Sequence, residues 1–126
     1  MKILHTADWH LGQNFYDRDR LAEQRLFLDF LLAQIAERHI DLLIIAGDIF
    51  DTANPPRAAE QVYYDFLTRL YALKHCEAVI VGGNHDSAPH LDAPRTILSN
   101  LNIHVVGRIP DAPEDAILRF ERNGKR

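Results

Sequence analysis

Residues 78–86 read Ala78-Val79-Ile80-Val81-Gly82-Gly83-Asn84-His85-Asp86, an apolar run followed by glycine, amide, imidazole and carboxylate groups. A run of four apolar residues is too short for a helix and is typical of a strand buried on both faces of a parallel sheet. The polar residues then stand where this strand ends. In open α/β sheets, ligands bind outside the carboxyl ends of the strands. This stretch therefore predicts both a fold class and the place of a functional site.

The same pattern occurs twice earlier in the chain. Asp8-Trp9-His10 follows an apolar run at residues 2–7, and Gly47-Asp48-Ile49-Phe50-Asp51 follows another at 42–46. Apolar residues at three- and four-residue steps predict helices over 20–38 and 57–75, and a weaker helix, interrupted by prolines, after Ser87. A short apolar run predicts a further strand at 103–106. This order predicts an α/β fold, a mostly parallel sheet flanked by helices. We expect residues 11–19 to form a loop.

The end of the chain predicts a hairpin. Residues 116–121 alternate between apolar and polar side chains, and Asn123-Gly124 is a strong signal for a tight turn between two strands. We expect residues 1–126 to be the N-terminal part of a larger domain, in which residues 116–126 begin a truncated hairpin. The alternative is a frayed tail with an accidental Asn-Gly pair.

Composition narrows the class of protein. The chain has 126 residues, of which 47% are hydrophobic, so a packed core is expected and wholesale disorder is excluded. The formal charge of -4 argues against a general polyanion-coating protein. The single cysteine excludes an internal disulfide, and the sequence shows no signal peptide or membrane span. We expect a soluble cytoplasmic protein.

The three polar groups predict one metal site. In an extended segment, residues two apart project to the same side, so Asp8 and His10 can share a cation. Gly47 has no side chain, so the backbone there can lie close to an ion bound by Asp48. Mixed carboxylate, amide and imidazole donors suit Mn²⁺. A lone carboxylate at a strand end is more often a helix cap or turn former, and this alternative stays open for Asp51.

These motifs resemble a known family. Asp8-x-His10, Gly47-Asp48-x-x-Asp51 and Gly83-Asn84-His85-Asp86 look like the first three motifs of the calcineurin-like metallophosphoesterases. The longer run from His5 to Gly12, together with Asn84-His85-Asp86-Ser87, is similar to the SbcD family, the nuclease subunits of bacterial SbcCD complexes and relatives of the Mre nucleases. The resemblance covers residues 1 to about 107.

The resemblance implies a role for each residue. Asp8 and His10 would bind a first metal ion, Asp48 would bridge two ions, and Asn84 would bind the second. His85 would be catalytic, placed over the scissile phosphate as an acid and oriented by Asp51 or Asp86. The ions would be Mn²⁺, with Mg²⁺ as the alternative. The protein would be a hydrolase, an exonuclease and endonuclease of DNA repair and recombination that is associated with the nucleoid.

The sequence also departs from the family pattern. The family completes its metal shells with a Gly-His motif and a Gly-His-x-His motif, and neither stands in these 126 residues. The second metal site is therefore expected to be incomplete, and this chain to be inactive or weakly active. In the family the helices at 57–75 and after Ser87 form a dimer contact, which implies a homodimer surface at Tyr63, Leu67, Tyr71 and Leu98. DNA ends and hairpins, and the SbcC ATPase subunit for the full-length protein, are the other implied partners.

Three alternatives remain at this level. The chain could be another metallophosphoesterase that hydrolyses cyclic nucleotides or small phosphodiesters. Protein phosphatases of the superfamily usually carry Asn-His-Glu, whereas Asn84-His85-Asp86 stands here. The chain could instead be a non-catalytic dimerisation fragment. A dinucleotide-binding fold would need a glycine-rich turn after the first strand, and residues 7–10 contain no glycine.

Overall fold

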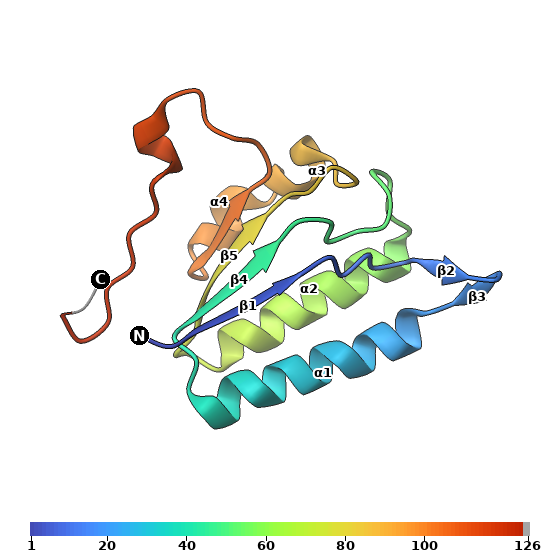
Figure 1. Cartoon of the computed structure of the whole chain (residues 1–126), viewed down its shortest axis with the longest axis horizontal. Helices are drawn as coiled ribbons and strands as arrows, with labels where there is room; N and C mark the ends of the chain where they lie inside the picture. The colour runs from blue at the N-terminus through green and yellow to red at the C-terminus, as the bar shows by residue number, and fades with distance from the viewer. Residues whose placement is uncertain (125–126) are drawn as a thin grey trace.

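The computed structural model describes residues 1–124 and is built around one four-stranded parallel sheet (Figure 1). Its strands lie in the order β1 (Ile3–Ala7), β4 (Leu42–Ala46), β5 (Glu77–Val81) and β6 (Ile103–Val106). The connections carry four helices: α1 (Leu21–Arg38), α2 (Arg57–Ala72), α3 (Ala88–Asp92) and α4 (Arg95–Ser99). The predicted α/β class and parallel sheet are confirmed. None of the helices in this described part of the chain is long and apolar enough to cross a membrane.

The helices cover one face of the sheet. The strands lie in the sheet in the same order as in the sequence. Because each crossover between parallel strands is right-handed, all the connecting helices lie on the same face. The side chains on that side are fully or almost fully buried: Leu43, Ile45, Ala78, Ile80, Ile103 and Val105. They pack with the inner stripes of α1 and α2, which include Leu28, Ile35, Phe66 and Leu70. This layer is the hydrophobic core of the described chain.

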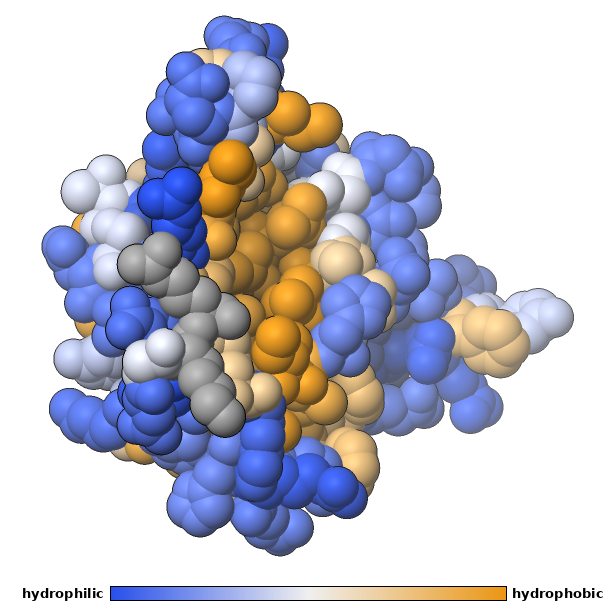
Figure 2. Space-filling model, turned by 60° about the vertical axis from the view of Figure 1, so that its left-hand side comes forward, coloured by the Kyte–Doolittle hydropathy of each residue, from blue (hydrophilic) through white to orange (hydrophobic). Residues whose placement is uncertain are grey.

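The opposite face of the sheet is more open. The alternate residues on each strand, among them His5, Ile44, Val79, Val81 and Val106, are partly or fully exposed. Figure 2 shows an apolar, hollowed surface beside the segment that follows β6. The sheet therefore has one packed face and one apolar face that the described residues leave partly in contact with solvent.

Two segments differ locally from the sequence prediction. The expected loop at 11–19 contains a small antiparallel hairpin of β2 (Asn14–Phe15) and β3 (Arg18–Asp19). The helix expected after Ser87 is divided into α3 and α4, with Pro94 as the N-cap residue of α4. Ala93 keeps helical backbone angles, but Pro94 lacks the N–H group that would continue the helix. Pro89 does not interrupt α3 because it lies in the first turn.

The strand predicted at 116–121 is wrong. Pro113–Ala116 form a 3-10 helix, and residues 117–121 pair with no strand in the described chain. Side chains hold this segment instead, since the Phe120 ring packs edge-on against His104 and the Arg122 guanidinium binds Asp41 at 3.1 Å. Asn123 and Gly124 do have the positive φ angles of a tight hairpin turn. Lys125 and Arg126, which the predicted hairpin also includes, lie outside the described residues.

The predicted dimer surface needs correction. Tyr63, Leu67 and Leu98 are buried within the chain, and burial raises the pKa of the Tyr63 hydroxyl. Only Tyr71 is exposed, at 38%. The side of α2 that carries Tyr63 and Leu67 contributes to the core because residues of α3 and of the β4–α2 loop pack there, as the Phe50–Tyr63 ring contact shows. Three of the four residues are therefore core residues of the described chain.

Ile80 and Val81 test the assignment of the two faces. Ile80 is 0% exposed on the helix-covered face, whereas its neighbour Val81 is 38% exposed on the open face. We expect Ile80→Thr to lower the free energy of unfolding by about 2–4 kcal/mol, because it leaves a cavity and buries a hydroxyl group. Val81→Thr should cost less than about 1 kcal/mol. Urea unfolding of both variants measures this, and equal losses would contradict the assignment.

Candidate metal centre

Three loops meet at the carboxyl ends of β1, β4 and β5. The parallel register aligns Ala7 with Ala46 and Ala46 with Val81, so the loops that follow start side by side. Backbone hydrogen bonds keep them together beyond the strands. Asp8 N–H donates to Gly47 O at 3.1 Å, His10 N–H to Asp48 O at 2.9 Å, and Gly47 N–H to Val81 O at 2.8 Å. The motifs expected to converge are therefore joined through their main chains.

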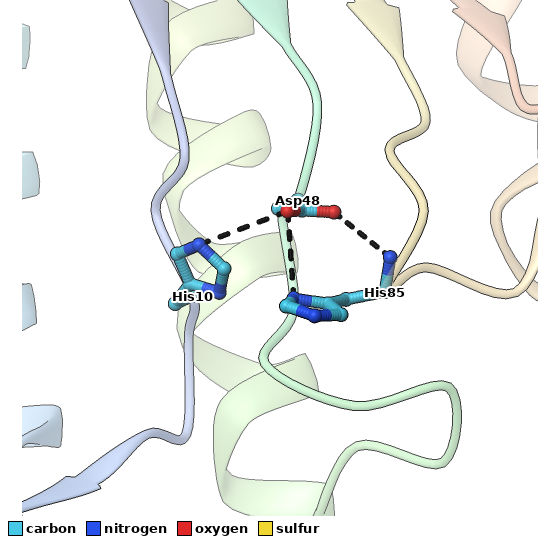
Figure 3. A group of neighbouring side chains, drawn as sticks. All are labelled: His10, Asp48 and His85. Atoms are coloured by element: carbon cyan, nitrogen blue, oxygen red, sulfur yellow. Dashed lines mark hydrogen bonds and ion pairs between the residues drawn. The ribbon is translucent and has the colours of Figure 1, made fainter.

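The Asp48 carboxylate lies at the centre of the group (Figure 3). Its Oδ2 is 3.8 Å from His10 Nε2 and 3.4 Å from His85 Nδ1. Its Oδ1 accepts a hydrogen bond from the His85 backbone N–H at 2.9 Å. One ligand atom from each of these three residues lies within 4.8 Å of the others, which is close enough for a single ion to contact all three.

The side chains of this group fit a divalent cation. His10 Nδ1 is buried and forms no hydrogen bond within residues 1–124. The nearest acidic atom is Asp51 Oδ1, at 3.4 Å. The other ring nitrogen, Nε2, faces Asp48, so it is the His10 atom placed to bind an ion within the group of three. Two imidazoles and a carboxylate form a donor set that divalent transition metals accept.

The backbone at this site is strained. Asp8, His10 and Asp48 have φ angles of 53°, 47° and 42°, in the left-handed region that residues other than glycine rarely adopt. Each such residue costs on the order of 1–3 kcal/mol, and such strain gathers at functional sites. The expectation that Asp8 and His10 lie in an extended segment is therefore wrong. Asp8 and His10 are left-handed residues on either side of the buried Trp9, and of the two only His10 brings its side chain into the close group.

The Asp86 carboxylate, which was predicted to orient His85, binds backbone N–H groups instead. Its Oδ2 accepts hydrogen bonds from the backbone N–H groups of Ile49 at 3.0 Å and Gly83 at 2.9 Å, and its Oδ1 accepts from Phe50 at 2.9 Å. These bonds occupy the carboxylate, so it ties the loop after β5 to the loop after β4. Asp51 lies beside His10. Asp48, and not Asp51 or Asp86, is the carboxylate placed to orient the His85 ring.

Asp8 and Asn84 stay predictions as ligands. The Asp8 carboxylate is exposed and lies alongside Gly47, outside the close group of three. The Asn84 side chain is also exposed, in the loop that carries His85, and its amide forms no hydrogen bond with any residue from 1 to 124. His85, predicted to act on substrate without binding metal, lies within ligand distance of Asp48 and His10.

Gln24 is a supporting residue that sequence reasoning missed. It is buried, and its amide nitrogen donates to Trp9 O at 3.2 Å and His10 O at 2.9 Å. Its amide oxygen accepts from Gly12 N–H at 3.1 Å. One side chain from α1 thus fixes the loop that carries His10. Its position in the sequence could have indicated this role, because Gln24 interrupts the apolar stripe that runs from Leu21 to Leu28.

Comparison with known proteins agrees with this geometry. The family profile described as calcineurin-like phosphoesterase matches residues 1–121. The chain belongs to the calcineurin-like phosphoesterase family. Within this family it is 46% identical to the SbcD subunit of the nuclease SbcCD from Escherichia coli strain K12 over 114 residues. It is 43% identical to the corresponding SbcCD subunit of Bacillus subtilis over 107 residues. The predicted resemblance to SbcD nuclease subunits is confirmed.

The matched relatives are longer proteins. The phosphoesterase chain is covered over 90% and 85% of its length in these two comparisons, but spans only 28% and 27% of the relatives. The crystal structure of Pseudomonas putida nuclease MPE matches 82% of this chain and 46% of that protein, with 27% identity and a TM-score of 0.50. The similarity in fold thus extends to a solved nuclease structure.

Gly83 tests how tightly the loops are packed. A Cβ atom at Gly83 would lie 2.2 Å from both the backbone nitrogen and Oδ1 of Asp48. We expect Gly83→Ala to displace Asp48, to lower the free energy of unfolding by about 1–3 kcal/mol and to abolish stabilisation by Mn²⁺. Thermal unfolding with and without Mn²⁺ measures both effects.

Gly82→Ala is the matched control. A Cβ atom there would meet Leu91 Cδ1 at 3.1 Å, where the methyl group can shift, and the Gly107 backbone oxygen at 3.3 Å, which is a much longer contact than the one at Gly83. We expect a smaller loss of stability and an unchanged response to Mn²⁺. Identical behaviour of the two variants would show that the space beside Asp48 is not limiting.

Gln24→Met should weaken the metal centre from outside it. The change keeps the side-chain volume but leaves the Trp9 carbonyl and the Gly12 N–H without their partner, and the His10 carbonyl with only the Gln13 N–H. We expect a loss of about 2–3 kcal/mol in stability and roughly tenfold weaker Mn²⁺ binding, since groups that position ligands affect affinity to this extent. Gln61→Met, at an exposed position of α2, is the control. Unchanged Mn²⁺ affinity in Gln24→Met, measured by calorimetry, would contradict the positioning role.

Proposed function

We propose that this protein is a metal-dependent phosphodiesterase that cleaves DNA. The observation that carries the proposal is the convergence of His10, Asp48 and His85 from three separate loops. A site for a divalent ion at the carboxyl edge of a parallel sheet is suited to phosphodiester hydrolysis. The similarity to the SbcD subunits of SbcCD nucleases supports DNA as the substrate.

We assign the following roles to the residues. Asp8 and His10 hold a first divalent ion, Asp48 bridges to a second, and Asn84 contributes to the second. When bound, such ions polarise the phosphate and activate the attacking water. Mixed oxygen and nitrogen donors favour Mn²⁺, with Mg²⁺ as the alternative.

His85 is the residue that handles the proton in this proposal. Its side chain is 50% exposed, so it can reach a bound substrate. Its Nδ1 faces Asp48 Oδ2 at 3.4 Å, which holds the ring and leaves Nε2 for the oxygen of the leaving group. A proton donated from Nε2 neutralises the leaving 3′ oxygen as the P–O bond breaks.

The described residues supply few ligands for two ions. Three ligand atoms lie within 4.8 Å of one another, and Asp8 lies outside that group. An ion held by few protein ligands binds weakly because water must complete its shell. We therefore propose that the 126-residue chain binds Mn²⁺ weakly and turns over slowly on its own.

The partners proposed for the full-length protein follow from its relatives. DNA ends and hairpins are the proposed substrates, and an SbcC-type ATPase subunit is the proposed protein partner, in a cytoplasmic, nucleoid-associated complex. A homodimer is also proposed, through Tyr71 and other exposed side chains, because Tyr63, Leu67 and Leu98 belong to the core.

Metal binding and turnover can be tested on the same samples. We expect Mn²⁺ to raise the melting temperature of the chain, and His10→Ala to remove that increase because it deletes a ligand. His90→Ala is the control, since His90 pairs with Glu60 between α3 and α2. Hydrolysis of bis-p-nitrophenyl phosphate should stay close to the background rate.

Two results would contradict parts of this proposal. The absence of any Mn²⁺-dependent stabilisation would contradict the metal centre. Robust turnover that is lost in His85→Ala would contradict slow turnover by the chain, while supporting the role of His85.

A further inference from the structure

The hairpin of β2 and β3 presents two aromatic rings to solvent. Phe15 is 61% exposed and Tyr16 is 87% exposed, and their rings meet edge to face with centroids 4.6 Å apart. Figure 1 shows this hairpin projecting beyond the carboxyl ends of the sheet strands, on the side of β1. Tyr16 in particular buries little of its surface within the described chain, so its ring adds little to stability.

The turn between the two strands does not favour a tyrosine. Tyr16 and Asp17 have φ angles of 47° and 58°, the left-handed pair of a two-residue hairpin turn. Such turns strongly favour Asn-Gly, which this chain uses at Asn123-Gly124. A tyrosine at the first position costs free energy that an asparagine would save. The ring of Tyr16 therefore needs an explanation other than the turn.

The base of the hairpin opens onto the metal centre. A hollow of about 340 Å³ is lined by Asp8 and His10 together with Gln13, Arg20, Glu23 and Phe27. The Arg20 guanidinium is held there by Gln13 Oε1 at 3.1 Å and Glu23 Oε2 at 3.3 Å. The hollow thus runs from the proposed metal ligands to the root of the aromatic hairpin, and carries a cation and a partly exposed phenyl ring.

The charged side chains of the hairpin give it no net charge with which to attract phosphates, which leaves stacking of its aromatic rings on nucleobases. Asp17, Arg18, Asp19 and Arg20 alternate in sign and cancel. A surface that tracked only the phosphate backbone would be basic. Exposed aromatic rings stack on nucleobases of any sequence when the strand is single, whereas bases inside a duplex are already stacked.

We propose that the β2–β3 hairpin binds unpaired nucleobases next to the scissile phosphate, with Tyr16 and Phe15 as the stacking rings. This inference rests on the proposed function, and it specifies the substrate as single-stranded DNA or a duplex end whose bases are unpaired. The strand enters from the hairpin, passes Arg20 in the hollow and presents its phosphate to Asp48 and His85.

Tyr16→Asn separates this role from a structural one. Asparagine suits the left-handed turn, so the variant should melt at the same temperature as the unchanged chain or higher. Its affinity for a fluorescein-labelled twelve-residue oligothymidylate, measured by anisotropy with Mn²⁺ present, should fall about tenfold, as expected for the loss of one stacked base. Ile97→Asn removes a similarly exposed apolar side chain from α4, near the opposite edge of the sheet, and should bind like the unchanged chain.

A matched abasic oligomer with the same number of phosphates completes the test. We expect the unchanged chain to bind it about as weakly as Tyr16→Asn binds the oligothymidylate. Equal affinity of the unchanged chain for both oligomers, equal affinity of Tyr16→Asn and the unchanged chain for oligothymidylate, or no binding by the unchanged chain would each overturn the stacking role. Failure of the proposed function is distinguishable, because it appears as the absence of Mn²⁺-dependent stabilisation in the chain without DNA.

Discussion

The Asp86 carboxylate accepts hydrogen bonds from three backbone N–H groups on two different loops, and the geometry of the metal centre depends on this cross-link. Two of the donors, Ile49 and Phe50, directly follow Asp48, and the third, Gly83, precedes Asn84 and His85. Parallel strands alone bring the loops to the same edge of the sheet. The cross-link then fixes the distance between Asp48 and His85 to within ligand range. Hydrogen bonds to a charged group are stronger than those between neutral groups, which makes a carboxylate suited to the task.

The strain at the site is supported by the surrounding structure. Asp8, His10 and Asp48 all have left-handed backbones, at a cost that isolated loops could not sustain. Gln24 holds the first loop through three hydrogen bonds, and Trp9 anchors it by packing on Phe66 with ring centroids 5.1 Å apart. The helix-covered face of the sheet, which is nearly all apolar, provides the rigid base for these contacts. The packed core thus stabilises these residues in a left-handed backbone conformation that is unfavourable on its own.

Periodicity and motif spacing predicted the strands at 42–46, 77–81 and 103–106 and the long helices, because each follows from the burial of a repeated apolar pattern. The convergence of His10, Asp48 and His85 was predicted for the same reason, since parallel strands end together. The strand at 116–121 was not predictable from its alternation, because a strand also needs a partner and none lies beside it in the described residues. The roles of Asp86 and Gln24 could not be read from the sequence either, as both depend on contacts between residues far apart in the chain. Burial of Tyr63, Leu67 and Leu98 was missed because a two-sided apolar helix looks the same whether its second face meets the same chain or another.

The central claim is that a divalent ion binds at Asp48, with the His10 and His85 rings close beside it. Mn²⁺ titration followed by NMR of the histidine rings tests this claim most directly. Bound Mn²⁺ broadens the signals of nearby nuclei, and the seven histidines of the chain report on different regions. His39 and His75 contact each other, and His104 pairs with Glu77 on the open face of the sheet. The account predicts that substoichiometric Mn²⁺ removes the ring signals of His10 and His85 while those of His39, His75 and His104 persist. Retention of the His10 and His85 signals, or uniform broadening of all seven, would contradict it.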